Sequence, residues 1–296
     1  MKESIVDEIM RQLSKKKDAT IHLDCNDDNL FSCTNDYFLV LFKISMKYGI
    51  KITMDEITLL LLKKLDISNI LKYLNYPIEQ CVTHCIGKID ILNYKTNDCI
   101  RKMRCYENLK KITLMFKYIS RDYFLNKDDF EIIISLKNHK KVEEFELIVF
   151  TRPCKGINKT IEILHKNIKC LIQLIRNSVK KLLLCGIPKL NHDITRTIER
   201  YMPNIEVLSL DDISFEERNC LSLFKKLKVV TISTFFPIEI PDNVNLFIIY
   251  TNQSTKNDTD QELIEEYSKK FSKRLVVGNI KNIFLTTSII LNIIDI

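Results

Sequence analysis

The stretch Tyr201-Met-Pro-Asn-Ile-Glu-Val-Leu-Ser-Leu-Asp-Asp-Ile213 decides the fold class of this 296-residue chain. It ends a helical pattern, turns at a proline and continues as a short strand. Its apolar residues are Ile205, Leu208, Leu210 and Ile213. Apolar residues at the first, fourth, sixth and ninth positions direct side chains into the core of a solenoid. The stretch therefore predicts one unit of a repeated array of strands and helices.

The same apolar spacing recurs along most of the chain. The other matches begin at Ile86, Leu109, Val142, Val179, Leu227 and Val244, with a weaker candidate near Leu275. Their starts are unevenly spaced, which indicates a degenerate array with insertions. Apolar residues three and four positions apart predict helices over 157–175 and 192–202, and the capping-box spacing of Thr259 and Glu262 predicts a helix over 259–271. The sequence thus predicts an α/β fold, with an irregular solenoid of parallel sheet and outer helices over residues 86–296.

Residues 1–85 follow a different pattern. A short strand is predicted from Thr20, helices over 37–46 and 57–65, and a further helix from Pro77. A solenoid needs its first open face covered. We therefore expect a small, mostly helical N-terminal module that serves as a cap or as an adaptor-binding module.

Short polar motifs predict where several helices begin. Thr53 and Glu56 have the spacing of a capping box, and so do Ser214 and Glu217. Asp193 is the predicted N-cap of the helix over residues 192–202. Each motif precedes an apolar pattern of helical spacing, so each predicts a helix start.

A doubly wound nucleotide-binding sheet would also alternate strands and helices. Such folds place closely spaced glycines after the first strand, so that the backbone can approach phosphate. The chain has only 5 glycines, which lie far apart, and contains no G-x-G-x-x-G or P-loop pattern. The glycine pattern therefore favours the solenoid.

Charge and cysteine content limit the classes of function. The net charge is +7 from 45 basic and 38 acidic residues. Lysines on solvated faces explain this mild excess, and attraction to nucleic acid is the alternative. The 10 cysteines, in a chain with a charged N-terminal sequence, predict reduced thiols and a location in the cytoplasm or nucleus. The apolar run 283–294 is too short to cross a bilayer, so we expect a closing strand and no membrane contact.

No motif in the sequence predicts catalysis or metal binding. Cys81, His84 and Cys85 lie close together, but their spacing differs from that of paired zinc ligands and suits buried thiols. The sequence contains no nucleophile elbow, H-E-x-x-H or paired-carboxylate motif. We therefore expect a protein that is not an enzyme and uses no cofactor or metal.

Residues between the core positions of each strand are expected on the opposite, concave face of the sheet, because side chains alternate along a strand. They mix charged, hydroxyl and apolar groups without a catalytic arrangement, as on a protein-binding surface. The predicted partner-binding residues are Lys111, Thr113, Glu144, Glu146, Lys181, Leu183, Val207, Ser209, Asp211, Val229, Thr231, Ser233, Ile248 and Tyr250.

The run Arg200-Tyr-Met-Pro-Asn-Ile-Glu-Val-Leu-Ser-Leu210 resembles the C-P-N-L-E-x-L-x-L core of leucine-rich repeats of the ribonuclease-inhibitor-like class. Met202 stands where that pattern often has cysteine. The resemblance covers residues 86–296 and is good only around Ile205–Ile213. It departs from the family after the strand, where an asparagine usually stands: this chain has Phe150, Ile187, Ile213 and Phe235, and only Asn252 fits.

Many proteins of this family carry an F-box before the repeats, which docks a Skp-type adaptor of a ubiquitin ligase. Residues 55–70 resemble an F-box, but they lack its usual proline and tryptophan. Residues 20–85 also resemble a shortened BTB or Skp-like fold. The F-box resemblance implies adaptor binding through Ile57, Leu61 and Leu65.

The sequence therefore predicts a non-enzymatic protein–protein interaction scaffold that binds a partner on its concave sheet. The F-box resemblance implies the role of a substrate receptor in a ubiquitin ligase. The alternative is a basic factor that associates with nucleic acid or ribosomes through lysine-rich faces. Salt separates the two, since affinity for nucleic acid falls steeply as salt rises.

Overall fold

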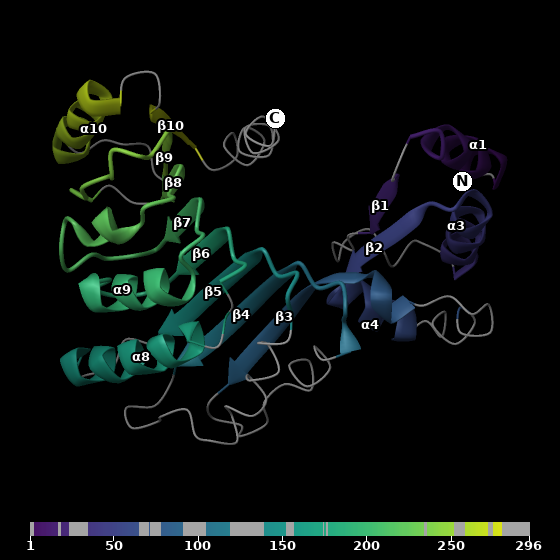
Figure 1. The fold of residues 1–296 in the computed structure, drawn as a ribbon, viewed down its shortest axis with the longest axis horizontal. Coiled ribbons are helices and arrows are strands. Elements are labelled where there is room, and N and C mark those ends of the chain that lie inside the picture. The colour runs from purple at the N-terminus through teal and green to yellow at the C-terminus, as the bar shows by residue number, and fades with distance from the viewer. Residues whose placement is uncertain are drawn as a thin grey trace. The chain divides into compact units, whose positions relative to one another are not determined.

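The computed structural model describes residues 3–16, 19–23, 35–64, 71, 78–90, 105–118, 139–151, 157–173, 175, 177–233, 236–251, 258–271 and 275–279. The fold is α/β, built on one sheet of ten strands that follow one another in chain order (Figure 1). Every strand pair whose register is described runs parallel. An open parallel sheet with strands in chain order agrees with the predicted fold class.

The strands are β1 (Thr20–Leu23), β2 (Lys51–Asp55), β3 (Val82–Asp90), β4 (Lys111–Tyr118), β5 (Glu144–Thr151), β6 (Lys181–Cys185), β7 (Val207–Asp211), β8 (Val229–Ile232), β9 (Leu246–Thr251) and β10 (Leu275–Asn279). The α-helices are α1 (Glu3–Leu13), α3 (Asn35–Tyr48), α4 (Glu56–Lys64), α8 (Ile157–Ile172), α9 (His192–Tyr201) and α10 (Asp258–Phe271). Two 3₁₀ turns are η1 (Ile78–Cys81) and η4 (Cys220–Leu223).

The chain divides into two compact units, Met1–Gly87 with Asp98–Thr113, and Lys88–Asn97 with Leu114–Ile296. The first unit contributes β1 and β2 to the sheet, which therefore begins at Thr20 rather than near Ile86. The described part of this unit contains the helices α1, α3 and α4 together with the strands β1 and β2. The assignment of separate roles to residues 1–85 and 86–296 stays a prediction.

In the first unit, α1 packs against α3, and α4 follows β2 directly. Lys47 of α3 forms an ion pair with Asp7 of α1 at 2.8 Å. The Asp55 carboxylate accepts a hydrogen bond from the Thr58 amide at 2.7 Å, which is the arrangement of an N-cap. The capping group of α4 is therefore Asp55 and not Thr53, because Asp55 directly precedes the helix and its carboxylate accepts the Thr58 amide.

A buried polar cluster joins the start of α4 to β3. Glu56 accepts hydrogen bonds from the Cys85 thiol at 2.8 Å and from the Tyr106 hydroxyl at 3.4 Å, and all three side chains are buried. A buried carboxylate is costly unless donors surround it, so this cluster fixes the position of α4.

The helix predicted from Pro77 is wrong beyond η1, because Cys85 lies on a strand.

In the second unit, α8, α9 and α10 lie on one side of β5–β10 (Figure 1). Alternate strand residues that face this side are buried and form the core. They are Phe145, Leu147, Leu182, Leu184, Leu208, Leu210, Val230, Ile232, Phe247 and Ile249. Leu164 and Ile168 of α8 and Ile194 and Ile198 of α9 are buried too, as expected for the apolar faces of amphipathic helices.

The repeat spacing is confirmed for six of the matches. The strands β4–β9 begin two residues after Leu109, Val142, Val179, Ile205, Leu227 and Val244, and all six residues are buried. The weaker candidate near Leu275 is also a strand, β10. The helices predicted over 157–175, 192–202 and 259–271 correspond to α8, α9 and α10.

The register predicted for the first match is wrong. That match begins at Ile86, but β3 already begins at Val82, and Val82 and Cys85 are the buried residues. The amide of Lys110 donates to the Thr83 carbonyl at 2.8 Å, which aligns β4 with this earlier register. A short apolar run can be read in more than one register, and hydrogen bonding to the neighbouring strand decides between them.

Two predicted helix starts are also wrong. Asn191, not Asp193, caps α9, since its side chain accepts a hydrogen bond from the Ile194 amide at 3.2 Å. Ser214 opens no α-helix: its hydroxyl accepts a hydrogen bond from the Lys189 amide at 2.8 Å, and only the turn η4 follows. The predictions for Asn252, Phe235 and the run 283–294 lie outside the described residues.

Candidate protein-binding face

The side chains between core positions lie on the sheet face opposite α8, α9 and α10, which we call the second face. Because the strands are parallel and in register, these side chains form rows. One row is Glu144, Lys181, Val207, Val229 and Leu246; the next is Glu146, Leu183, Ser209, Thr231 and Ile248; a third begins with Ile148, Cys185 and Asp211. The rows bring residues of several repeats onto one surface.

Most of the predicted partner-binding residues are partly exposed. These are Lys111, Glu144, Glu146, Lys181, Leu183, Val207, Ser209, Asp211, Ser233 and Tyr250. Thr113, Val229, Thr231 and Ile248 are buried, with exposed fractions of 4, 2, 6 and 1%. These four side chains are not accessible to a partner in this structure, so we correct their assignment to the binding surface.

An apolar cluster explains the burial over β8 and β9. Val229 and Ile248 pack with the partly buried Val207, Leu246, Tyr250 and Val276. The apolar residues that one strand after another adds to the second face thus pack on one another. The accessible part of the second face in this unit is therefore carried by β5, β6 and β7.

Charges on β5–β7 are partly paired. Lys181 lies 3.2 Å from the Glu144 carboxylate, and both side chains are more than a third exposed. The Cys185 thiol donates a weak hydrogen bond to Asp211 at 3.7 Å. Burial, and then the negative charge of Asp211, raise the pKa of Cys185 to about 11. The thiol is therefore protonated at neutral pH and is a poor nucleophile.

Tyr250 lies beside the same carboxylate. Burial raises the pKa of the Tyr250 hydroxyl, and the charge of Asp211 and a hydrogen bond to it add to the effect. The thiol and the phenol are both neutral donors to one carboxylate. This arrangement orients Asp211, and because the thiol and the phenol both stay protonated it supplies no activated nucleophile.

Of the three residues predicted to bind an adaptor, Ile57 and Leu61 lie on α4. Ile57 is 44% exposed, and Leu61 is partly buried. Leu60, which was not predicted, is 45% exposed. Leu65 lies outside the described residues. The side chains at positions 57, 60 and 61 share one helix face, since residues three and four apart are neighbours on a helix.

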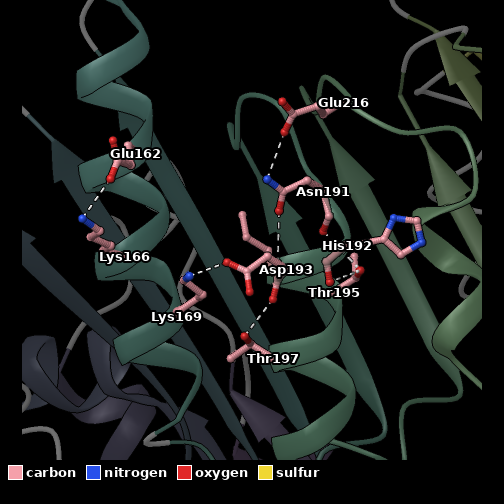
Figure 2. A network of polar contacts seen from close by, with 10 residues as sticks. Glu162, Lys166, Lys169, Asn191, His192, Asp193, Thr195, Thr197 and Glu216 are labelled. Atoms are coloured by element: carbon pink, nitrogen blue, oxygen red, sulfur yellow. Dashed lines mark hydrogen bonds and ion pairs between the residues drawn. The ribbon is translucent and has the colours of Figure 1, made fainter.

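A polar network on the helix side lies at the amino end of α9 (Figure 2). Lys169 of α8 forms an ion pair with Asp193 of α9. Asn191, the N-cap, donates a hydrogen bond to Glu216 at 3.0 Å. The network therefore connects α8, α9 and the segment after β7. Exposed pairs of this kind contribute only about 0–1 kcal/mol each, so their main effect is alignment.

His192 extends this network. Its amide donates to Glu217 at 2.7 Å, and its ring nitrogen Nδ1 pairs with the same carboxylate. These two bonds lower the pKa of Glu217. A histidine oriented by a carboxylate could serve a nucleophile. However, among the described residues no hydroxyl or thiol forms a hydrogen bond with the His192 ring, so we interpret the pair as structural.

A ladder of side-chain donors, which sequence reasoning missed, joins neighbouring strands at their amino ends. Asn204 donates to the Asn177 carbonyl at 2.7 Å. Asn243 donates to the Leu227 carbonyl at 2.7 Å, and Ser178 donates to the Val142 carbonyl at 2.6 Å. The family's asparagine ladder follows the strand, whereas this ladder precedes it. The signal in the sequence is a polar residue directly before the first apolar position of a repeat.

Acidification is expected to destabilise the fold through His165 of α8. Its Nε2 lies 2.8 Å from the Pro188 carbonyl oxygen. Burial lowers the pKa of His165 below its ordinary value of 6.5, while the hydrogen bond to Pro188 opposes the shift. The unfolded chain therefore binds more protons than the folded protein as the pH falls through 6.5, and stability decreases in that window. Urea unfolding at about pH 7 and about pH 5 should show a lower midpoint in acid.

The matched variant is His165→Gln, which keeps a donor beside Pro188 but does not titrate. Its unfolding midpoint should fall less between the two pH values than that of the unchanged protein. His139 also has a pKa lowered by burial and is present in both proteins, so a residual decrease is expected. An identical decrease in both proteins would contradict the assignment to His165.

Side chains of metal-ligating types, thiols and apolar helices are three further features of the described part of the chain. No group of three or more His, Cys, Asp and Glu side chains there could hold a metal ion, and its cysteines are free thiols. None of the helices in these ranges is long and apolar enough to cross a bilayer. No protein-family model matches the chain, and no curated protein is detectably similar to it in sequence.

Proposed function

We propose that this protein is a non-enzymatic scaffold of the leucine-rich-repeat type that binds a protein partner on the second face over β5, β6 and β7. The observation that carries the proposal is the row arrangement. Successive parallel strands each add a column of partly exposed side chains, and the columns stay in register. Such a surface suits recognition of a protein, because it presents mixed polar and apolar groups over several repeats.

The charge pattern favours a protein over nucleic acid. Lysines beside the strand starts are matched by carboxylates: Lys180 lies 3.5 Å from Glu143, and Lys228 lies 2.8 Å from Glu206. Nucleic-acid binding depends on phosphate contacts from a clustered excess of lysine and arginine. Binding to single-stranded DNA that weakens steeply with added salt would support the alternative factor instead.

The test is affinity capture with quantitative mass spectrometry, using the full chain and two variants. The face variant combines Glu146→Lys, Leu183→Asp and Ser209→Lys. The control variant changes Arg196→Glu on the exposed side of α9. A specific partner should be captured about equally by the unchanged protein and the control, and at least about tenfold less by the face variant. Equal capture by all three proteins would contradict the proposal, provided that circular dichroism shows the variants folded.

A second part of the proposal concerns the role of a ubiquitin-ligase substrate receptor. The exposed apolar residues of α4 would contact a Skp-type adaptor. Purified adaptor should bind the unchanged protein and lose binding to the double variant Ile57→Asp and Leu61→Asp. Met46→Asp is the control, because Met46 is an apolar residue of comparable exposure, 40%, on α3. Absence of adaptor binding, or unchanged binding by the double variant, would refute this part alone.

A further inference from the structure

One repeat departs from the others at the carboxyl end of its strand. The ninth position of the repeat is buried at Ile187 and Ile213, with exposed fractions of 0 and 5%. The same position in the β5 repeat is Phe150, which is 49% exposed. The sequence spacing predicts a core residue at all three places, so Phe150 contradicts the prediction.

The length of β5 explains the difference. β6 and β7 end at their fifth residue, and the residues that follow them, Gly186 and Asp212, have positive φ values of 70° and 48° and turn the chain. β5 continues as a regular strand to Thr151. Continued alternation places Val149 in the core and Phe150 on the second face, on the same side as Ile148. An aromatic side chain is therefore presented to solvent on the face already proposed to bind a partner.

Apolar and acidic groups surround this end of the face. Ile148 is in register with Cys185, which is in register with Asp211. The protonated thiol of Cys185 is an apolar neighbour rather than a charged one. Asp211 takes its hydrogen bonds from neutral groups, and among the described residues no basic side chain forms an ion pair with it.

We infer that Phe150 and Ile148 form the anchor point of the second face, and that the partner segment bound there combines an apolar side chain with a lysine or arginine. The inference rests on the proposed function and names the chemistry of its partner. Aromatic anchors that become desolvated dominate protein interfaces. A basic side chain complements Asp211, whereas an acidic segment would be repelled by that carboxylate.

The experiment is a selection from a random 12-residue peptide library, displayed on phage, against the immobilised full chain. Enriched peptides should pair an apolar residue with lysine or arginine. Synthetic copies should bind Phe150→Ser at least about tenfold more weakly. Asp211→Lys should also weaken the binding of these peptides. Ile9→Ser is the matched control, because Ile9 on α1 has the same 49% exposure and lies in the other unit. Binding to Ile9→Ser should be unchanged.

Each other outcome counts against the inference in a distinct way. Peptides that are lost on Leu183→Asp but retained by Phe150→Ser would support the proposed function and overturn the anchor. Peptides unaffected by both variants would count against the second face altogether. Enrichment of acidic peptides, or of none, would overturn the partner chemistry. A concentration-dependent dimer in sedimentation that Phe150→Ser abolishes would show that a second copy of this chain occupies the anchor instead.

Discussion

Replacing Gly186 with alanine is expected to lower the free energy of unfolding of the second unit by about 3–5 kcal/mol. Gly186 follows β6 with φ of 70°, a conformation that costs an L-residue about 1–2 kcal/mol. A Cβ atom at this position would lie 2.1 Å from the Val149 carbonyl oxygen. That oxygen belongs to the backbone of β5, which is held by its pairing with β6. Relief therefore requires the sheet itself to shift, and urea unfolding followed by circular dichroism should detect the loss.

Gly49→Ala is the matched control for this prediction. Gly49 also has a positive φ, 65°, but nothing lies within 4 Å of the Cβ position there. Its replacement should cost only the conformational penalty, about 1–2 kcal/mol. The difference between the two variants isolates the close approach of β6 to β5. Equal costs would show that the backbone near Gly186 relaxes freely, and would contradict a steric role for the Val149 carbonyl.

The strands could be predicted from the sequence because each needs the same few apolar positions. Leu109, Val142 and Val179 all precede a strand by two residues, and the helices between strands show the ordinary spacing of an amphipathic face. These signals are local and repeat several times. The row arrangement of the candidate face follows directly once the strands are parallel and adjacent. This arrangement could therefore also be predicted from the sequence.

The differences between the predicted and the observed structure depend on contacts between residues that are far apart in the sequence, which a local pattern does not contain. The register of β3 is set by its bond to Lys110 and by burial of Cys85 against Glu56, which are distant in the sequence. The exposure of Phe150 depends on how far β5 continues before it turns. A spacing template assumes that every strand turns at the same position, and Gly186 marks where this assumption holds for β6.

Burial over β8 and β9 had a signal that the strand template did not use. At the first outward position, the earlier repeats have Lys111, Glu144 and Lys181, whereas later ones have Val229 and Leu246. A change from charged to apolar residues at a supposedly solvated position indicates that the position is covered. Comparing the outward positions repeat by repeat, rather than only the core positions, would have predicted a smaller binding surface.

Replacing Tyr267 with phenylalanine is expected to lower the free energy of unfolding by about 1–3 kcal/mol, through one lost hydroxyl. On α10, this hydroxyl accepts a hydrogen bond from the Ile238 amide at 2.8 Å and donates to the Phe236 carbonyl at 2.7 Å. Tyr267 and Ile238 are both buried. The variant therefore removes one of the two acceptors of the buried Ile238 amide, which also donates to the Phe236 carbonyl at 2.8 Å, and it removes the hydroxyl that donates to that carbonyl. The ring packs edge-on against Phe247 at 5.0 Å, and phenylalanine preserves that contact.

Tyr201→Phe is the control, because among the described residues the Tyr201 hydroxyl forms no hydrogen bond; its effect should stay within about 0.5 kcal/mol. Alkaline pH gives a second measurement. Burial raises the pKa of Tyr267 to about 12. The unfolded chain loses this proton first, so the stabilisation present below about pH 10 declines between about pH 10 and 12. Tyr267→Phe should therefore lose less stability than the unchanged protein over that window. Equal losses, or equal stability of both proteins near neutral pH, would show that the hydroxyl does not hold the segment at Ile238 against α10.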